Sequence, residues 1–220
     1  MNEFVTMALR CCQNVDRITS LVEISKPRLF TNVAWDTEGF IGMYDEKVIL
    51  TFKGSDSDID WWKVNFRFWK KIIPYDNVNP QILVHAGFIN AYKSVRDELL
   101  KYVRESGAKE IWCFGHSLGG AMATLASVDF QYNFPGVQVK VVTFGSPRVG
   151  NSQFEKSFRH RVPDYIRIVN SNDLVPRLPP QLFNYSHVGE YLHVGSTYRW
   201  WKFWGVSDHD LGKYKANILN

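Results

Sequence analysis

Short apolar runs and segments of helical period alternate along the middle of this chain. Ile111–Phe114, Val137–Phe144 and Tyr165–Val169 are rich in β-branched and aromatic residues, which is typical of buried strands. Ser152–Arg161, between the last two, is a polar segment with helical spacing. This strand-helix-strand order predicts right-handed crossovers and an α/β fold with a mostly parallel central sheet and helices on both faces. In such a sheet, ligands bind at the carboxyl ends of the strands.

The N-terminal part predicts a helix, a hairpin and a longer helix. The first helix runs to about Asp16, and Ile41–Tyr44 pairs with Val48–Phe52 as a hairpin that turns at Asp45-Glu46. The longer helix ends near Gly107, a plausible cap. Its apolar face consists of residues three or four positions apart, Phe88, Tyr92, Val95, Leu99 and Tyr102.

The segment Gly115-His116-Ser117-Leu118-Gly119-Gly120 separates a predicted strand from a small-residue stretch that predicts a helix. A Gly-x-Ser-x-Gly turn in this context is typical of a nucleophile elbow, because the tight bend leaves no room for a Cβ at the two glycines. Such a turn exposes the hydroxyl of Ser117 at the end of the strand and aims the backbone N–H of Leu118 at a developing oxyanion. The strand and helix on its two sides favour the elbow over an ordinary structural turn.

A nucleophilic serine needs a histidine to accept its proton and a carboxylate to orient that histidine. Asp173 comes directly after the strand Tyr165–Val169, which places its carboxylate at the same sheet edge as Ser117. Asp164 lies at the opposite end of that strand. Asp173 is therefore the preferred acid.

The histidine is chosen by chain order, which in α/β-hydrolases is serine, acid, histidine. His116 is adjacent to Ser117 in a strained turn and is expected to point away from it. His187 and His193 flank Val188–Leu192, a predicted strand in which a histidine is most often a partly buried sheet residue. His209 lies on a loop before the amphipathic segment that closes the chain, so it can reach over the sheet edge. His209 is therefore preferred as the base.

Composition narrows the classes of function. The 220 residues carry a net charge of +4 with both signs scattered along the chain, so no basic stripe for nucleic acid is present. No linker or repeat interrupts the chain, which predicts a single domain over residues 1–220. Residues 111–128 contain no charged side chain, but glycines and a histidine interrupt them, which favours two buried elements over a transmembrane segment.

Cysteines, histidines and the first residues bear on compartment and cofactors. Cys11 and Cys12 are adjacent, a poor arrangement for a mutual disulfide, so a reduced compartment is the simpler expectation. The histidine spacing suggests no zinc site, and we expect no metal or other cofactor. The apolar run Phe4–Leu9 is too short for the core of a signal peptide. The chain is therefore expected to be leaderless and cytoplasmic.

Four separated blocks together resemble the class 3 lipases, the fungal-type branch of the α/β-hydrolase fold, over about residues 47–214. By this resemblance Ser117 is the nucleophile, Asp173 the acid and His209 the base, with Tyr214 following it, which agrees with the choice from chain order. The blocks are Phe52-Lys53-Gly54-Ser55 followed by Asp60-Trp61, His85-x-Gly87-Phe88, the Gly-His-Ser-Leu-Gly-Gly elbow, and Asp173-Leu-Val-Pro-Arg-Leu-Pro-Pro180.

The resemblance also implies an oxyanion hole and a lid. Ser55 would add its backbone N–H and hydroxyl to the N–H of Leu118. Residues 56–66 would form a short amphipathic lid over the serine, with Trp61, Trp62 and Phe66 among its apolar residues. A helix packed permanently on the core is the alternative for this segment.

The function implied is that of a serine carboxylic-ester hydrolase, a lipase acting on acylglycerols or related lipid esters, with transient contact to a lipid interface and no cofactor. A soluble esterase for short-chain or polysaccharide-linked esters stays open, since the same machinery serves several acyl groups. A non-catalytic scaffold that keeps the fold is the alternative from another class.

Overall fold

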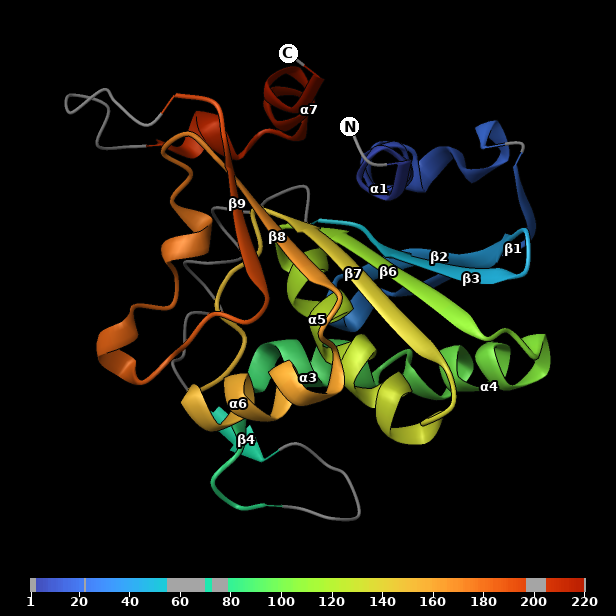
Figure 1. Cartoon of the computed structure of the whole chain (residues 1–220), viewed down its shortest axis with the longest axis horizontal. Coiled ribbons are helices and arrows are strands. Elements are labelled where there is room, and N and C mark those ends of the chain that lie inside the picture. The colour runs from blue at the N-terminus through green and yellow to red at the C-terminus, as the bar shows by residue number, and fades with distance from the viewer. Residues whose placement is uncertain (1–2, 22, 55–69, 73–78, 197–204, 220) are drawn as a thin grey trace.

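A computed structural model describes residues 3–21, 23–54, 70–72, 79–196 and 205–219. Seven strands in these ranges form one sheet in the order β1-β2-β3-β6-β7-β8-β9 (Figure 1). The first three pair antiparallel, and from β3 onward every neighbouring pair is parallel. The strands are β1 (Ile24–Asn32), β2 (Thr37–Tyr44), β3 (Lys47–Phe52), β6 (Glu110–His116), β7 (Gln138–Phe144), β8 (Tyr165–Asn170) and β9 (Glu190–Val194). The predicted α/β class with a mostly parallel sheet is confirmed.

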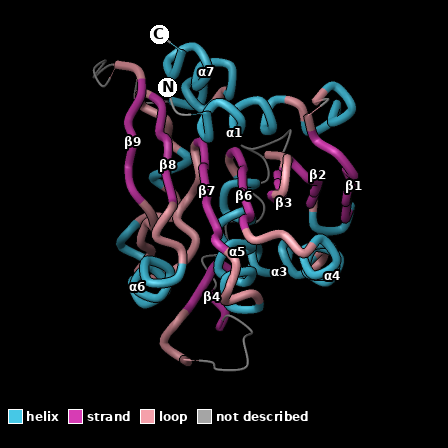
Figure 2. Tube along the Cα trace, turned by 45° about the vertical axis from the view of Figure 1, so that its right-hand side comes forward, coloured by secondary structure: helices cyan, strands magenta, loops and turns pink. Residues whose placement is uncertain are grey.

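Helices cover both faces of this sheet (Figures 1 and 2). One face carries α1 (Glu3–Gln13) and α7 (Leu211–Leu219). The other carries α3 (Ala86–Lys93), α4 (Arg96–Ser106), α5 (Leu118–Asn133) and α6 (Ser152–Arg161). A separate antiparallel pair joins β4 (Lys70–Ile72) to β5 (Leu83–His85). Short 3-10 helices are η1 (Val15–Ser20), η2 (Val33–Trp35), η3 (Val175–Arg177), η4 (Gln181–Phe183) and η5 (Gly205–His209).

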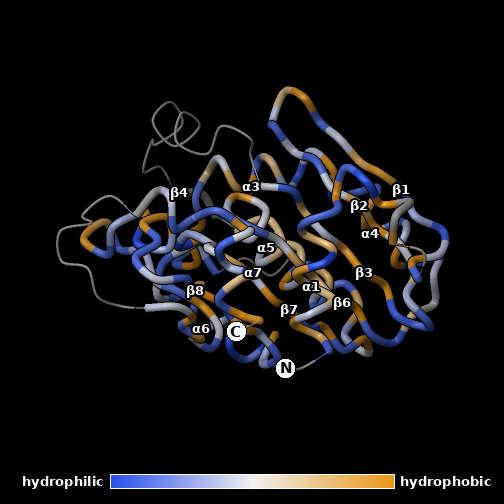
Figure 3. The backbone as a smooth tube through the Cα atoms, turned by 90° about the horizontal axis from the view of Figure 1, so that it is seen from above, coloured by the Kyte–Doolittle hydropathy of each residue, from blue (hydrophilic) through white to orange (hydrophobic). Residues whose placement is uncertain are grey.

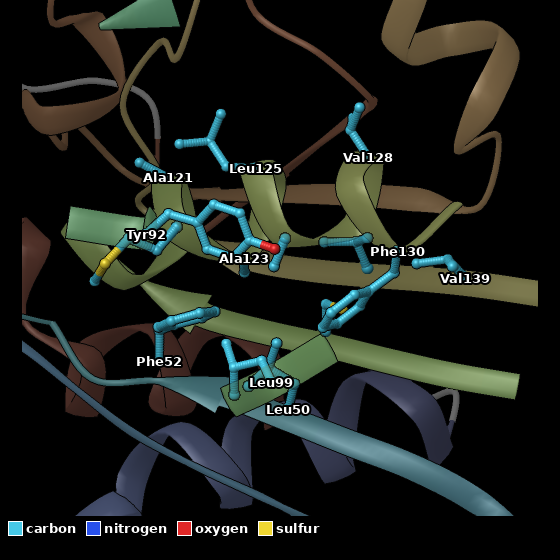
Figure 4. Packing of buried hydrophobic residues seen from close by; sticks show 14 of the residues in the cluster. Leu50, Phe52, Tyr92, Leu99, Ala121, Ala123, Leu125, Val128, Phe130 and Val139 are labelled. Carbon is cyan, nitrogen blue, oxygen red and sulfur yellow. The ribbon is translucent and has the colours of Figure 1, made fainter. Parts of the chain in front are cut away.

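Strand β6 shows why the sheet needs helices on both sides. Ile111 and Cys113 pack into the cluster under α3 to α6, whereas Trp112 and Phe114 pack toward α1. Successive strand residues point to opposite faces, so a strand that is apolar at every position must be covered twice. The hydropathy view shows the same concentration of apolar positions in β3, β6 and β7 (Figure 3). Figure 4 shows the α5 side of this core, where side chains of β3, α4 and α5 meet.

The long helix predicted over Phe88–Tyr102 is wrong in one respect, because the chain forms two helices there. α3 ends at Lys93 and α4 begins at Arg96. Val95 has φ −124° and ψ −3°, outside the helical region, and Ser94 Oγ donates to the carbonyl of Ala91 at 2.7 Å. Such a side-chain bond to the backbone competes with the helical ladder. The apolar residues of both helices nevertheless pack into one core cluster.

Other predicted elements are confirmed with small shifts at their ends. β2 and β3 form the expected hairpin, and Asp45 in its turn has φ +51°. α4 is followed by Gly107, whose φ of +65° favours glycine. The first helix stops at Gln13 rather than near Asp16, and η1 follows it. β9 lies two residues later in the chain than predicted.

The uncharged run of residues 111–128 divides into a strand and a helix. β6 occupies its first part and α5 begins at Leu118, with Ser117 between them. Among the helices of the described ranges, none combines the length and apolar character that crossing a membrane requires.

Candidate active site

Ser117 lies in a strained turn between β6 and α5. Its φ of +54° and ψ of −125° fall where a residue with a side chain is rarely found, a conformation that costs about 1–3 kcal/mol. A Cβ on Gly115 would lie 2.2 Å from the carbonyl oxygen of Gly119, and one on Gly119 would lie 2.4 Å from the carbonyl oxygen of Phe52. Both glycines are therefore required for the turn, as the elbow pattern predicts.

The hydroxyl of Ser117 is completely buried and makes no hydrogen bond to any residue in the described part of the chain. The serine carbonyl accepts bonds from the N–H groups of Gly120 at 3.0 Å and Ala121 at 3.4 Å, which starts α5. Leu118 is the first residue of that helix, where a backbone N–H has no carbonyl one turn earlier to bond. Within the described residues, this N–H is therefore left for a ligand oxygen beside Ser117.

The Phe-x-Gly turn after β3 approaches the same serine. A Cβ on Gly54 would lie 3.4 Å from Ser117 Cβ and 3.1 Å from His116 Nδ1. Lys53, one residue earlier, pairs with Asp16 at 3.2 Å and Glu38 at 3.3 Å. The Phe-x-Gly turn thus lies against the elbow at Ser117, η1 and β2. Other residues predicted for the oxyanion hole and the lid lie outside the described ranges, namely Ser55, Trp61, Trp62 and Phe66.

Asp173 and His209 form a buried pair at the carboxyl edge of the sheet. His209 Nδ1 donates to Asp173 Oδ2 at 2.7 Å, and the two residues are 6% and 2% exposed. A carboxylate only accepts, so Nδ1 carries the proton and Nε2 is left as the basic nitrogen. The N–H of Val175 donates to Asp173 Oδ1 at 2.9 Å, which holds the carboxylate in one orientation.

Tyr214 of α7 adds a further donor to the same carboxylate. Its hydroxyl donates to Asp173 Oδ2 at 2.5 Å. Burial, followed by the negative charge of Asp173, raises the pKa of Tyr214 well above its ordinary value. The phenol therefore remains protonated and remains a donor. In the sequence, only the family resemblance singled out this residue.

Gly145 is a part of the site that the sequence analysis missed. It follows β7 and has φ +59°. A Cβ there would lie 2.7 Å from His209 Cε1 and 2.8 Å from Asp173 Oδ2. Its position next to a central strand, at the same edge as Ser117, was the signal that could have found it.

The histidines that chain order left open make other contacts. His193 Nε2 donates to the carbonyl of Ser171 at 3.0 Å, and His187 Nε2 donates to that of Pro176 at 2.6 Å. Burial, with help from Arg167, lowers the pKa of His187 to about 3. Asp164 precedes β8, at the strand end opposite to Asp173, as predicted. The structure thus brings His209, and neither of these histidines, to the carboxylate of Asp173.

The family model described as lipase (class 3) matches residues 49–183. The chain belongs to the class 3 lipase family. The lipase of Rhizopus niveus is 32% identical over 175 residues, which cover 73% of this chain and 42% of that protein. The secreted mono- and diacylglycerol lipase A of Penicillium cyclopium is 34% identical over 164 residues, covering 70% and 50%. This class 3 lipase chain thus spans half or less of the length of these curated relatives.

Solved structures agree with the α/β-hydrolase fold of this family. Lipase II from Rhizopus niveus superposes with a TM-score of 0.72 at 26% identity, covering 88% of this chain and 80% of that chain. The predicted fold, a mostly parallel sheet covered on both faces, is confirmed.

The predicted cytoplasmic location is wrong. The Penicillium cyclopium relative is named a secreted lipase. The prediction was drawn from the adjacent cysteines and from the first residues of the chain, and the latter are no guide to a leader when the chain spans only 50% of that relative.

Proposed function

We propose that this class 3 lipase chain hydrolyses the carboxylic esters of acylglycerols through Ser117, Asp173 and His209. The observation that carries the proposal is the buried Asp173–His209 pair, whose geometry leaves Nε2 of the imidazole as a base. Ser117 lies at the same sheet edge in a strained elbow, the arrangement from which a serine acts as a nucleophile.

The first half of the reaction forms an acyl-enzyme. His209 Nε2 takes the proton of Ser117 Oγ while that oxygen attacks the ester carbonyl carbon. The imidazolium is stabilised by the negative charge of Asp173, 2.7 Å from Nδ1. The tetrahedral intermediate then expels the alcohol, which receives its proton from His209. The bond of Ser117 to His209 closes only in the reacting complex, since such bonds are often long without substrate.

The second half releases the acid. A water molecule gives a proton to His209 Nε2 and its oxygen attacks the acyl carbon. The new tetrahedral intermediate breaks the bond to Ser117 Oγ, which takes the proton back from His209. The carboxylic acid leaves and the free enzyme is restored.

We assign the oxyanion hole to the N–H of Leu118 and to Ser55. The position of Leu118 at the start of α5 supports the first donor, and the close approach of Gly54 to Ser117 supports the second. One such donor is worth about 100- to 1,000-fold in turnover.

The names of two relatives support the substrate class. One is named a lipase and the other a mono- and diacylglycerol lipase, which supports acylglycerols as substrates of this chain. We further propose that residues 56–66 form a lid that opens during transient contact with a lipid interface. We also propose that residues 1–220 form one domain, because β1 to β3 and β6 to β9 of the described ranges belong to one sheet.

The test is a panel of p-nitrophenyl esters from acetate to palmitate, with a triglyceride emulsion alongside. Wild type should hydrolyse the esters, and turnover of triglyceride should rise steeply above its solubility limit. Ser117→Ala should abolish hydrolysis while circular dichroism stays unchanged, and the exposed Ser25→Ala serves as the matched control. Hydrolysis of short soluble esters alone would indicate an esterase, and no hydrolysis of any ester would indicate a scaffold.

A pH profile tests the base. The value of kcat/KM should fall on the acid side as His209 becomes protonated. A rate that does not change between about pH 5 and 8 would contradict this assignment.

A further inference from the structure

Asp208 and His209, predicted to lie on a loop, are the last two residues of the 3-10 helix η5. Their backbone carbonyls accept hydrogen bonds from the sheet edge. Asn170 Nδ2, at the end of β8, donates to the carbonyl of Asp208 at 2.8 Å. His116 Nε2, at the end of β6, is 2.8 Å from the carbonyl oxygen of His209. A carbonyl only accepts, so Nε2 of His116 carries a proton.

We propose that His116 and Asn170 are positioning residues that hold the main chain at Asp208–His209 and thereby set where the imidazole of His209 lies relative to Ser117. This inference rests on the proposed function, in which His209 is the base. It adds a role for a histidine that the sequence analysis left without one.

His116 links the nucleophile directly to the base. It is the last residue of β6 and directly precedes Ser117, so adjacent residues carry the reacting hydroxyl and the donor that holds the backbone of His209 in η5. The two imidazole rings also lie against each other, with centroids 4.5 Å apart and planes 30° apart. The ring of Tyr214 meets His116 edge-on at 6.0 Å.

The bond to Asp173 alone does not fix the position of the His209 imidazole. It holds the imidazole of His209 at Nδ1, around which the ring could still swing if the backbone moved. The bond from His116 holds the backbone end of the same residue. Two points, one held from the segment after β8 and one from the end of β6, define the position of Nε2. Proton transfer needs that position to be accurate, since an error of 1 Å costs about 100-fold in rate.

Asn170 is itself held in the orientation that the proposal needs. Its Oδ1 accepts from Asn217 Nδ2 of α7 at 2.6 Å, so its Nδ2 faces the carbonyl of Asp208. Asn170 is completely buried. In addition, Asp208 Oδ2 accepts from the N–H of Asn172 at 3.3 Å. Asp208, the residue before the base, is therefore held by two bonds, one from the last residue of β8 and one from the segment after it.

The experiment compares two replacements of one histidine. His116→Phe keeps an aromatic ring against His209 but removes the donor, whereas His116→Gln restores an amide N–H near the position of Nε2. We expect His116→Phe to lower kcat about 10- to 100-fold with KM changed less than about twofold. We expect His116→Gln to retain kcat within about threefold. A purely structural role would not be rescued in this way.

A second variant and a matched control complete the test. Asn170→Asp removes the other donor and should lower kcat in the same way, which keeps the test open if His116→Phe does not fold. His193→Phe removes a comparable bond, to the carbonyl of Ser171 at 3.0 Å, and should change kcat less than about twofold. A folded His116→Phe with wild-type kcat would overturn the proposal, and so would an equal loss in His193→Phe or His116→Gln.

A readout without turnover separates this inference from the proposed function. The proton that His209 shares with Asp173 should give a downfield proton NMR signal, which His209→Gln removes and thereby assigns. His116→Phe should shift or broaden this signal, whereas His193→Phe should leave it unchanged. An unaltered signal in His116→Phe would refute the positioning role even if the wild type hydrolysed no ester.

Discussion

Gly145 lies so close to His209 that a side chain cannot fit between them. A Cβ on Gly145 would lie 2.7 Å from His209 Cε1, and the φ of +59° also disfavours any other residue. Gly145, directly after β7, therefore packs against the imidazole and limits where the ring can lie.

Gly145→Ala should displace the imidazole and lower kcat by about 100-fold or more, because proton transfer tolerates little error in position. Gly136→Ala is the matched control, since a Cβ there would have no atom within 4 Å. The measurement is kcat on a soluble ester, with the folded state verified by circular dichroism. Wild-type kcat in Gly145→Ala would show that His209 is not the base in this position.

Tyr214→Phe should lower kcat about 10- to 100-fold, because a hydrogen bond to the charged carboxylate of Asp173 is lost. KM should stay near the wild-type value, since the phenol does not reach the substrate in this mechanism. Tyr102→Phe also loses one hydroxyl bond, to the carbonyl of Lys26 at 2.9 Å, and should retain full activity. Equal kinetics in the two variants would show that the bond to Asp173 has no role.

His85→Asn should make stability less sensitive to acid. Burial lowers the pKa of His85 from 6.5 to about 4, so between these values the unfolded chain binds the proton and the folded protein does not. Stability is therefore lost as the pH falls through this window, by about 3 kcal/mol from this group. Asparagine cannot titrate, and it can still accept the N–H of Gly87, as Nδ1 does at 3.1 Å.

The measurement for this variant is the melting temperature from pH 7 to pH 4. The fall of the melting temperature per pH unit should be smaller in His85→Asn than in wild type, whatever the absolute stability of the variant. It should not vanish, because burial also lowers the pKa of His187 to about 3. An unchanged slope would mean that His85 is protonated in the folded protein.

Asp129→Asn should lower the free energy of unfolding by about 3 kcal/mol, because it leaves the guanidinium of Arg96 without its buried counter-charge. Asp129 is completely buried and accepts from Arg96 Nε at 2.5 Å and from the hydroxyl of Tyr92 at 2.6 Å. Asp97→Asn removes a second carboxylate that pairs with Arg96. Asp97 Oδ1 lies 3.7 Å from Arg96 Nη1 and its side chain is 97% exposed, so this change should have no measurable effect on the free energy of unfolding. Urea unfolding with an unchanged m-value is the check. Equal destabilisation by both changes would contradict the role given to burial.

Local chemistry was sufficient to predict much of the fold and of the candidate site. The hairpin, the parallel strands and the elbow could be predicted because side-chain alternation, turn residues and two glycines act over a few neighbouring residues. Asp173 was found for a similar reason, since its place after β8 assigns it to one edge of the sheet. The break between α3 and α4 was not predictable, because the apolar spacing continues through it and only the structure shows the bond of Ser94 to Ala91 and the non-helical backbone of Val95.

The sequence by itself determined the α/β class, the strained turn at Ser117 and the order in which an acid and a histidine follow it. The sequence also favoured Asp173 and His209 as that acid and base, but only the tertiary structure decided the geometry of their pair, the room that Gly145 leaves for it and the contact of His116 with η5. These relationships join the ends of β6, β7 and β8 to η5. Their residues are 28 to 93 positions apart, as in the 93 between His116 and His209 and the 28 between Gly145 and Asp173. Periodicity and turn chemistry do not act over such separations, and only the packing of the sheet brings these side chains together.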